Sequence, residues 1–186
     1  MIRVLRAELA ELDADAVLRP VSAEWEAVTP AMRRLEQAAG PQLAAWCERL
    51  GEPPVGSALI TPAGALRVRY VVHVVVRSRT EPVSEPVVRR ALRNGLRRLQ
   101  EWGIERVAMP PIGTGAGNLD ADDVARIMLD EYYDHATTAD YPTAVTIAVS
   151  SDYELETFRG QLAARELPYL TDSPAGTRPP AGGGAA

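Results

Sequence analysis

Apolar positions along the chain fall into short β-branched runs separated by longer segments with helical spacing. Short apolar runs bounded by turn residues predict buried strands. The expected strands are residues 2–5, 16–18, 57–61, 68–76, 106–110 and 144–149. Residues 68–76 form a nearly continuous valine-rich run, which is typical of a central strand covered on both faces. The strand at 16–18 is expected to end at Pro20, because proline cannot donate to a sheet ladder.

Other segments repeat their apolar residues at intervals of three and four, which predicts helices. The expected helices are residues 30–39, 43–50, 87–102, 119–134 and 154–167. The clearest is 87–102, which sets an apolar stripe against a face of arginines. Alternating strands and helices predict an α/β fold, here a three-layer α/β/α sandwich with a central mixed, mostly parallel sheet. In such sheets ligands bind beyond the carboxyl ends of the strands.

The chain is expected to divide into one domain and a tail. Residues 1–170 carry the apolar periodicity and have the length of an ordinary single domain. Residues 171–186 belong to a C-terminal segment rich in Pro, Gly and Ala, with no apolar periodicity from Pro174 onward. Such a segment cannot bury enough surface to offset its ordering entropy, so we expect a disordered tail.

Charge and composition narrow the classes of function. The formal net charge is −5, which argues against a general or sequence-specific nucleic-acid binder, since such proteins carry a basic footprint. All 20 basic residues are arginine. A GC-rich genome and a thermophilic source both explain this bias, and the two explanations stay open.

The cysteine and histidine content argues against disulfides and metal sites. Cys47 is the single cysteine and lies in an apolar helical pattern, so we interpret it as a small buried hydrophobe. A chain without an internal disulfide fits a reducing cytoplasm, where we expect this protein. His73 and His135 supply no metal-ligand spacing, so we expect no metal and no cofactor. We expect no signal peptide and no membrane span.

The sharpest local motif is the glycine-rich stretch at residues 109–118, MPPIGTGAGN, between a predicted strand and a predicted helix. Alternate glycines permit positive φ and close backbone approach, and successive N–H groups beside a helix N-terminus form an anion nest. The motif therefore predicts a phosphate site, although a plain tight turn stays open. It is not a P-loop, because the chain has no lysine. Asp120, Asp122 and Asp123 are read as N-capping and first-turn acids.

Three stretches together resemble the macrodomain family. They are AAGPQLAAWCERLG (residues 38–51), VGSALITPAGALRVRYVVHVVV (55–76) and PPIGTGAGNLDADDVARIMLDEY (110–132). The resemblance spans about residues 2–167 and implies the three-layer fold and a cleft for ADP-ribose. It implies that the glycine-rich loop holds the diphosphate.

The resemblance also identifies departures from the family pattern. Glu8 replaces an aspartate that accepts a hydrogen bond from the adenine amino group. Ser22 falls on an asparagine that holds the distal ribose, and Met32 on an aspartate proposed to activate water. A stacking aromatic falls near Ser150, with Tyr153 as a stand-in. The ligand-binding residues implied are Glu8, Leu9, Ser22, Val28, Thr29, Ile112, Gly113, Thr114, Gly115, Ala116, Gly117, Asn118, Leu119 and Ser150.

The function that follows is a binding module for ADP-ribose or a related adenine diphosphate nucleotide, with the usual hydrolytic residues replaced. The expected partners are ADP-ribose or an ADP-ribosylated protein. No catalytic residue is nominated, because general-base catalysis needs a titratable group near the water. Two alternatives stay open: an enzyme that removes ADP-ribose from proteins or acetyl from O-acetyl-ADP-ribose, and a scaffold that binds no nucleotide.

Four other features keep two interpretations each. Arg19 pairs either with a phosphate or with an acid. Trp25 either stacks on a ligand or covers the edge of the core. The arginine face at residues 89–98 either docks a phosphate polymer or is a solvated surface. His73 is read as a satisfied core residue rather than a catalytic one.

Overall fold

The computed structural model describes residues 1–115 and 119–171, with side chains through residue 165. The strands are β1 (Ile2–Arg6), β2 (Ala16–Ser22), β3 (Ala58–Pro62), β4 (Tyr70–Arg77), β5 (Arg106–Met109) and β6 (Ala144–Val149). The helices are η1 (Leu9–Glu11, a 3₁₀ turn), α1 (Pro30–Ala39), α2 (Pro41–Arg49), α3 (Glu85–Glu101), α4 (Ala121–Ala136) and α5 (Asp152–Thr171).

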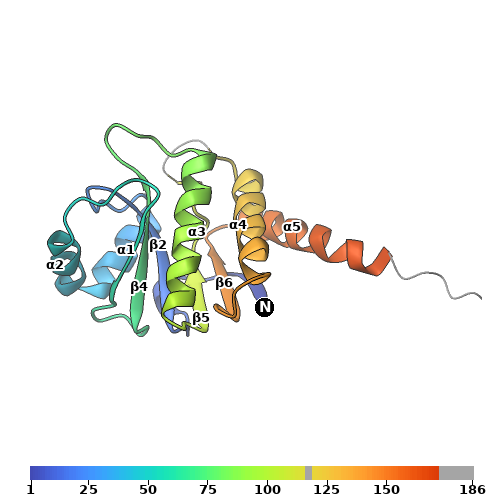
Figure 1. The fold of residues 1–186 in the computed structure, drawn as a ribbon, viewed down its shortest axis with the longest axis horizontal. Coiled ribbons are helices and arrows are strands. Elements are labelled where there is room, and N and C mark those ends of the chain that lie inside the picture. The colour runs from blue at the N-terminus through green and yellow to red at the C-terminus, as the bar shows by residue number, and fades with distance from the viewer. Residues whose placement is uncertain (116–118, 172–186) are drawn as a thin grey trace, which may run out of the picture.

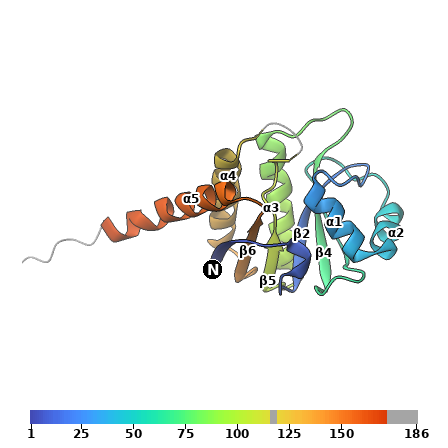
Figure 2. The same ribbon diagram turned by 180° about the vertical axis from the view of Figure 1, so that it is seen from behind.

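The strands form one mixed, mostly parallel sheet with the order β1-β6-β5-β2-β4-β3. Only the β3–β4 pair is antiparallel among the described strands. Helices α3 and α4 cover one face of the sheet in Figure 1, and α1 covers the other face, seen in Figure 2. The expected three-layer α/β/α sandwich is therefore confirmed.

Two apolar clusters hold the layers together. One packs the sheet against α3, α4 and the first part of α5, and contains the predicted stripe residues Val88, Leu92 and Leu96. The other packs the opposite face against α1 and α2. Gly95 lets α3 approach the sheet closely, because a Cβ there would lie 2.8 Å from Val74 Cγ1.

The expectation that the strand ends at Pro20 is wrong, since β2 continues to Ser22. Beyond Val17, β4 is the only strand that pairs with β2, because the pairing with β5 stops there; on the other side β2 forms just an isolated bridge between Val21 and Ala27. On its β5 side, Pro20 therefore lies beyond the hydrogen bonds between the two strands. A strand tolerates proline at such a position, because no backbone N–H is needed there.

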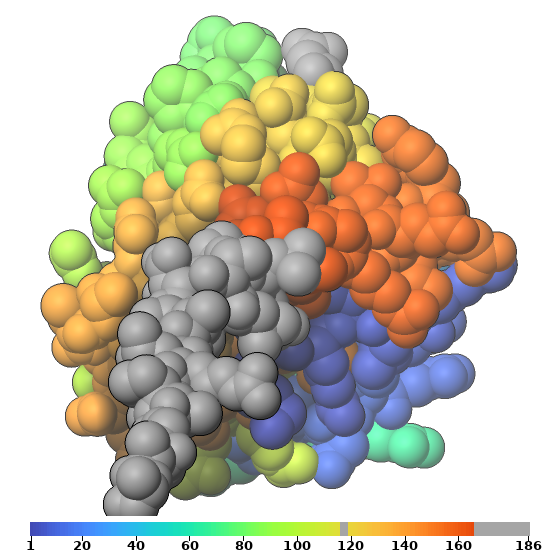
Figure 3. Space-filling model, turned by 90° about the vertical axis from the view of Figure 1, so that its right-hand side faces the viewer, coloured from blue at the N-terminus to red at the C-terminus, as the bar shows by residue number. Residues whose placement is uncertain are grey.

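The last helix is longer than expected, since α5 ends at Thr171 rather than near residue 167. It runs between α4 and the N-terminal strand, as Figure 3 shows, and its far end extends away from the body in Figure 1. Except for Thr171, the expected tail at 171–186 lies outside the described residues. Within the described part of the chain, no helix is both long and apolar enough to span a bilayer.

Candidate functional site

A hollow of about 310 Å³ opens at the carboxyl edge of the sheet, which we call the edge hollow. Its lining comes from the ends of β1 and β6, from α1 and from the turn after β5: Arg6, Ala7, Glu8, Leu9, Ala31, Arg34, Pro110, Ala148, Val149 and Ser150. Since β1 and β6 are neighbours in the sheet, Glu8 and Ser150 come together although they are far apart in sequence. The structure thus gathers three of the predicted residues, Glu8, Leu9 and Ser150, in one place.

The edge hollow carries an ion pair that sequence reasoning missed. Arg34 on α1 donates two hydrogen bonds to Glu8, from Nε to Oε2 at 3.2 Å and from Nη2 to Oε1 at 3.1 Å. Both side chains are about half exposed, at 53% and 54%. The position of Arg34 on the polar face of α1 gave no sign of this contact, because Glu8 precedes it by 26 residues.

The loop between β2 and α1 contacts the glycine-rich loop. Thr29 caps α1, its hydroxyl accepting a hydrogen bond from the Met32 N–H at 3.2 Å. A Cβ placed on Gly115 would overlap Thr29 Cγ2 and come within 3.8 Å of the Val28 carbonyl oxygen. Gly115 is therefore required for close approach of two chain segments.

The glycines of the glycine-rich loop were expected to adopt positive φ, and not all of them do. Gly113 has a positive φ of 117°, and a Cβ there would lie 3.2 Å from Leu119 Cδ1. Gly115 is not in the left-handed region, so the prediction of positive φ is wrong for it. Ala116, Gly117 and Asn118 lie outside the described residues.

Two other predicted residues already have partners inside the protein. Ile112 is fully buried, and its N–H donates to Met128 Sδ at 3.3 Å. Ser22 is also fully buried, and its hydroxyl accepts from the Glu26 N–H at 3.1 Å. Thr114 and Leu119 are partly exposed on the loop. Contact of these four residues with a ligand stays a prediction.

The acids after the glycine-rich loop have the structural role that was expected. Asp120 caps α4, with its carboxylate accepting from the Asp123 N–H at 2.8 Å. Asp122 and Asp123 lie in the first turn, where negative charge complements the helix dipole.

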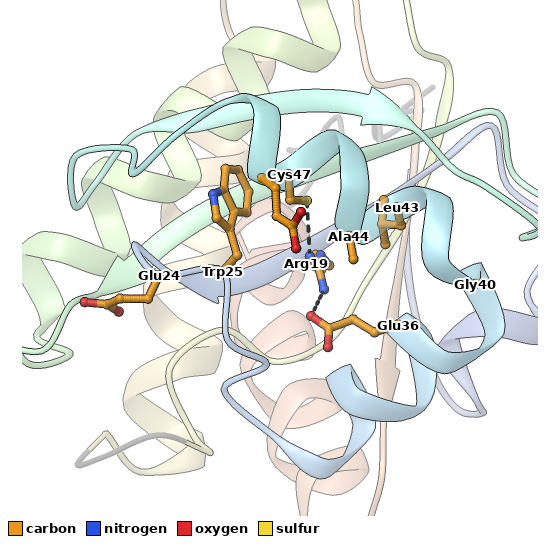
Figure 4. Close-up of a pocket in the computed structure, with 9 residues that line it drawn as sticks. Arg19, Glu24, Trp25, Glu36, Gly40, Leu43, Ala44 and Cys47 are labelled. Carbon is orange, nitrogen blue, oxygen red and sulfur yellow. Dashed lines mark hydrogen bonds and ion pairs between the residues drawn. The ribbon is translucent and has the colours of Figure 1, made fainter.

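A second hollow, of about 260 Å³, lies between α1, α2 and the loop after β2 (Figure 4). We call it the Arg19 hollow. The Arg19 side chain is only 2% exposed, and its guanidinium forms an ion pair with Glu36. Its Nε donates to His73 Nδ1 at 2.9 Å, and its Nη2 lies 3.9 Å from Cys47 Sγ. Of the two interpretations of Arg19, the structure therefore supports pairing with an acid.

The hydrogen bonds define the protonation of His73. Arginine can only donate, so His73 Nδ1 must be the acceptor and the proton must lie on Nε2. His73 Nε2–H then donates to Thr61 Oγ1 at 2.8 Å. Burial, reinforced by the Arg19 cation, holds the pKa of His73 well below its usual 6.5. His73 is thus a neutral, satisfied core residue, as predicted.

This arrangement makes folding sensitive to mild acid. The unfolded chain protonates His73 near pH 6.5 while the folded protein does not, so the folded state binds fewer protons. The contribution of His73 to the free energy of unfolding is therefore fully present above pH 6.5. Below pH 6.5 this contribution falls by about 1.4 kcal/mol per pH unit. Urea unfolding between pH 7 and about pH 5 measures this slope. His73→Gln should lack this share of the slope, and an unchanged slope in the variant would contradict the assignment.

Cys47 and Trp25 complete the surroundings of Arg19. Cys47 is buried, as predicted, and burial raises the pKa of its thiol although Arg19 opposes this. A protonated, buried thiol is a poor nucleophile. The Trp25 indole packs edge-on against His73, with ring centres 5.3 Å apart, and donates to the Gly51 carbonyl oxygen at 2.6 Å. Among the described residues no group of three potential ligands could hold a metal ion.

Several arginines on the exposed face of α3 form ion pairs. Arg93 donates to both oxygens of the buried Glu131 at 3.0 and 3.1 Å, and Arg89 contacts Glu85, Asp130 and Glu131. These carboxylates neutralise the part of the face nearest α4, which disfavours a phosphate-polymer dock there.

The fold is an α/β/α sandwich with a mixed sheet, and comparison with known proteins identifies the family. A family model described as Macro domain matches residues 31–128, more than half of the chain. The chain belongs to the macrodomain family.

Proteins of similar sequence include three from bacteria. An uncharacterized protein of Aquifex aeolicus is 31% identical over 134 residues, covering 70% of this chain and 79% of the relative. A macro domain-containing protein of Streptomyces coelicolor is 29% identical over 169 residues, covering 87% and 98%. An uncharacterized protein of Mycobacterium tuberculosis is 26% identical over 165 residues, and this chain spans only 45% of its length.

Solved structures share the fold at low sequence identity. The Oceanobacillus iheyensis macrodomain superposes with a TM-score of 0.80 at 17% identity, covering 90% of this chain and 93% of that one. The Trypanosoma brucei macrodomain in complex with ADP-ribose superposes with a TM-score of 0.78 at 20% identity, covering 87% and 68%.

Proposed function

We propose that this protein binds ADP-ribose, or a closely related adenine diphosphate nucleotide, without hydrolysing it. The observation that carries the proposal is the edge hollow, where Glu8 and Ser150 meet at the carboxyl edge of the sheet. Ligands of such sheets bind at this edge. Family membership supports the same ligand, since similar macrodomains have been solved with ADP-ribose.

The edge hollow offers two exposed guanidinium groups to a nucleotide. Arg6 and Arg34 line it together with Glu8; Arg6 pairs with Asp152 at 3.1 Å and Arg34 pairs with Glu8. Both ion pairs are more than half exposed, so a phosphate can compete with the carboxylates for either arginine. A carboxylate has about four acceptor sites. Glu8 can therefore keep its Arg34 bond and accept from the amino group of adenine. The neighbouring loop adds backbone groups at Gly113 and the N-terminus of α4, which favour negative charge.

Two positions support the proposed lack of hydrolysis. By the family resemblance, Met32 replaces an aspartate and Ser22 replaces an asparagine, and both side chains are fully buried. Neither side chain can act as a general base near neutral pH. The proposal therefore extends to recognition of ADP-ribosylated proteins as a binding partner rather than as a substrate.

Calorimetric titration tests the proposal. The protein is titrated with ADP-ribose, and with AMP, ADP and NAD as comparators. We expect micromolar binding that prefers ADP-ribose, with no free ADP-ribose released from a modified protein above the rate in buffer. No binding at millimolar ADP-ribose would contradict the nucleotide site. Release of ADP-ribose at an enzymatic rate would contradict its non-hydrolytic character.

A further inference from the structure

The lining of the edge hollow combines buried apolar residues with a few polar ones. Leu9, Ala148 and Val149 are buried and contribute apolar surface to it. Four polar residues belong to the same lining: Arg6, Glu8, Arg34 and Ser150. In a hollow of this kind a planar ring can lie against the apolar surface, while a small number of polar groups fixes its orientation.

Two of the four polar residues are bonded to partners outside the lining. Ser150 donates from its backbone N–H and from its hydroxyl to Glu154 Oε2, each at 2.9 Å. Arg6 Nη1 donates to Asp152 Oδ1 at 3.1 Å, and Asp152 is not a lining residue. Glu8 and Arg34, in contrast, both line the hollow and are bonded to each other. An acceptor and a donor are thus held side by side at the hollow.

The Glu8–Arg34 pair keeps unused donors and acceptors. Arginine has five N–H donors, and Arg34 uses one on Nε and one on Nη2 for its two bonds to Glu8. Its Nη1 has no hydrogen-bond partner within the described part of the chain. Each oxygen of Glu8 also retains acceptor capacity. Because both side chains are about half exposed, these groups are open to a ligand.

An acceptor beside a donor is complementary to one edge of adenine. The amino group of adenine donates, and the ring nitrogen next to it, N1 or N7, accepts. Asparagine and glutamine recognise adenine in this way, with the oxygen and nitrogen of one amide. Here the Glu8 carboxylate would supply the acceptor and the Arg34 guanidinium the donor, and the two bonds between them fix their relative orientation.

We propose that Arg34 is a specificity-determining residue of the nucleotide site, which donates a hydrogen bond to the ring nitrogen beside the adenine amino group while Glu8 accepts from that amino group. This inference rests on the proposed binding of an adenine nucleotide and adds a second contact to the base. Hydrogen bonds from a charged donor are stronger than those between neutral groups, so the contact should be measurable. Arg6 then remains the guanidinium of the hollow that is available to a phosphate.

Calorimetric titration with three ligands tests the role of Arg34. ADP-ribose is compared with its 1-deaza and 7-deaza analogues, in which carbon replaces adenine N1 or N7. We expect the protein to bind at least one analogue about tenfold more weakly than ADP-ribose, because that analogue cannot accept from Arg34. The identity of the weaker analogue shows which edge of the base faces the Glu8–Arg34 pair.

Two matched variants assign this discrimination to one side chain. Arg34→Met removes the guanidinium from the lining of the hollow. Arg33→Met removes the same charge from the next position of α1, which is exposed and does not line the hollow. We expect the loss of affinity for the weaker analogue to disappear in Arg34→Met and to stay unchanged in Arg33→Met.

The possible results separate this inference from the proposed function. Equal affinity of the unmodified protein for all three ligands would overturn the role of Arg34. Discrimination that is unchanged in Arg34→Met would overturn it as well, and a uniform loss of affinity in that variant would place Arg34 at a phosphate. Both results would leave ADP-ribose binding intact. If the unmodified protein binds none of the three ligands at millimolar concentration, the proposed function and this inference both fail.

Discussion

Gly115→Glu should weaken ADP-ribose binding by about a hundredfold or more, which corresponds to about 2.8 kcal/mol. Any side chain at residue 115 meets Thr29, whose hydroxyl is engaged in capping α1 and cannot rotate away without losing that bond. The loops must then separate, and the new carboxylate places a negative charge beside the expected diphosphate. Calorimetric titration of the variant with ADP-ribose measures the loss.

Two further variants separate the causes of that loss. Gly160→Glu adds the same charge on α5, at an exposed position where a Cβ meets nothing within 4 Å, and should bind like the parent. Gly115→Gln keeps the size without the charge, so it should show the steric part alone. If Gly115→Glu binds ADP-ribose like Gly160→Glu, the glycine-rich loop does not hold the diphosphate.

Arg19→Ala should lower the free energy of unfolding by about 3–5 kcal/mol, the usual cost of removing one partner from a buried ion pair. The change leaves a void in the layer between α1 and the sheet and removes the donor to His73 Nδ1. For a chain of this length the midpoint of thermal unfolding should fall by roughly 10 °C. Urea unfolding monitored by circular dichroism gives the free energy directly.

Arg34→Ala is the matched control for this measurement. Arg34 also pairs with one glutamate, but that pair is about half exposed to solvent. Exposed pairs contribute about 0–1 kcal/mol, so the control should be close to the parent. Equal destabilisation by the two variants would mean that burial of Arg19 adds nothing to its contribution.

Local periodicity was sufficient to predict most elements. The valine-rich run at 68–76 and the stripe at 87–102 became β4 and α3, since each pattern can bury its apolar residues in only one regular conformation. The helix at 30–39 was predicted with the bounds that α1 has, because Pro30 and Gly40 limit it at both ends. Such signals act over a few residues and need no knowledge of the rest of the chain.

The sequence predicted several residues of the candidate site but not the contacts between them. The sequence indicated the glycine-rich loop and, through the family resemblance, Glu8 and Ser150. It could not indicate Arg34, whose bond to Glu8 depends on how α1 lies against the end of β1. Nor could it show that Gly115 is needed for contact with Thr29 rather than for a positive φ.

By itself the sequence determined the order and type of the elements, the layered class of fold and the loop most suited to a phosphate, because these follow from short-range spacing. Only the tertiary structure decided whether β2 could pass Pro20, which depends on β5 ending its pairing at Val17. It also decided between two partners for Arg19. Glu36 and His73 lie 17 and 54 residues away in the chain, and a buried guanidinium pairs with whatever the packing of helix on sheet brings within hydrogen-bonding distance.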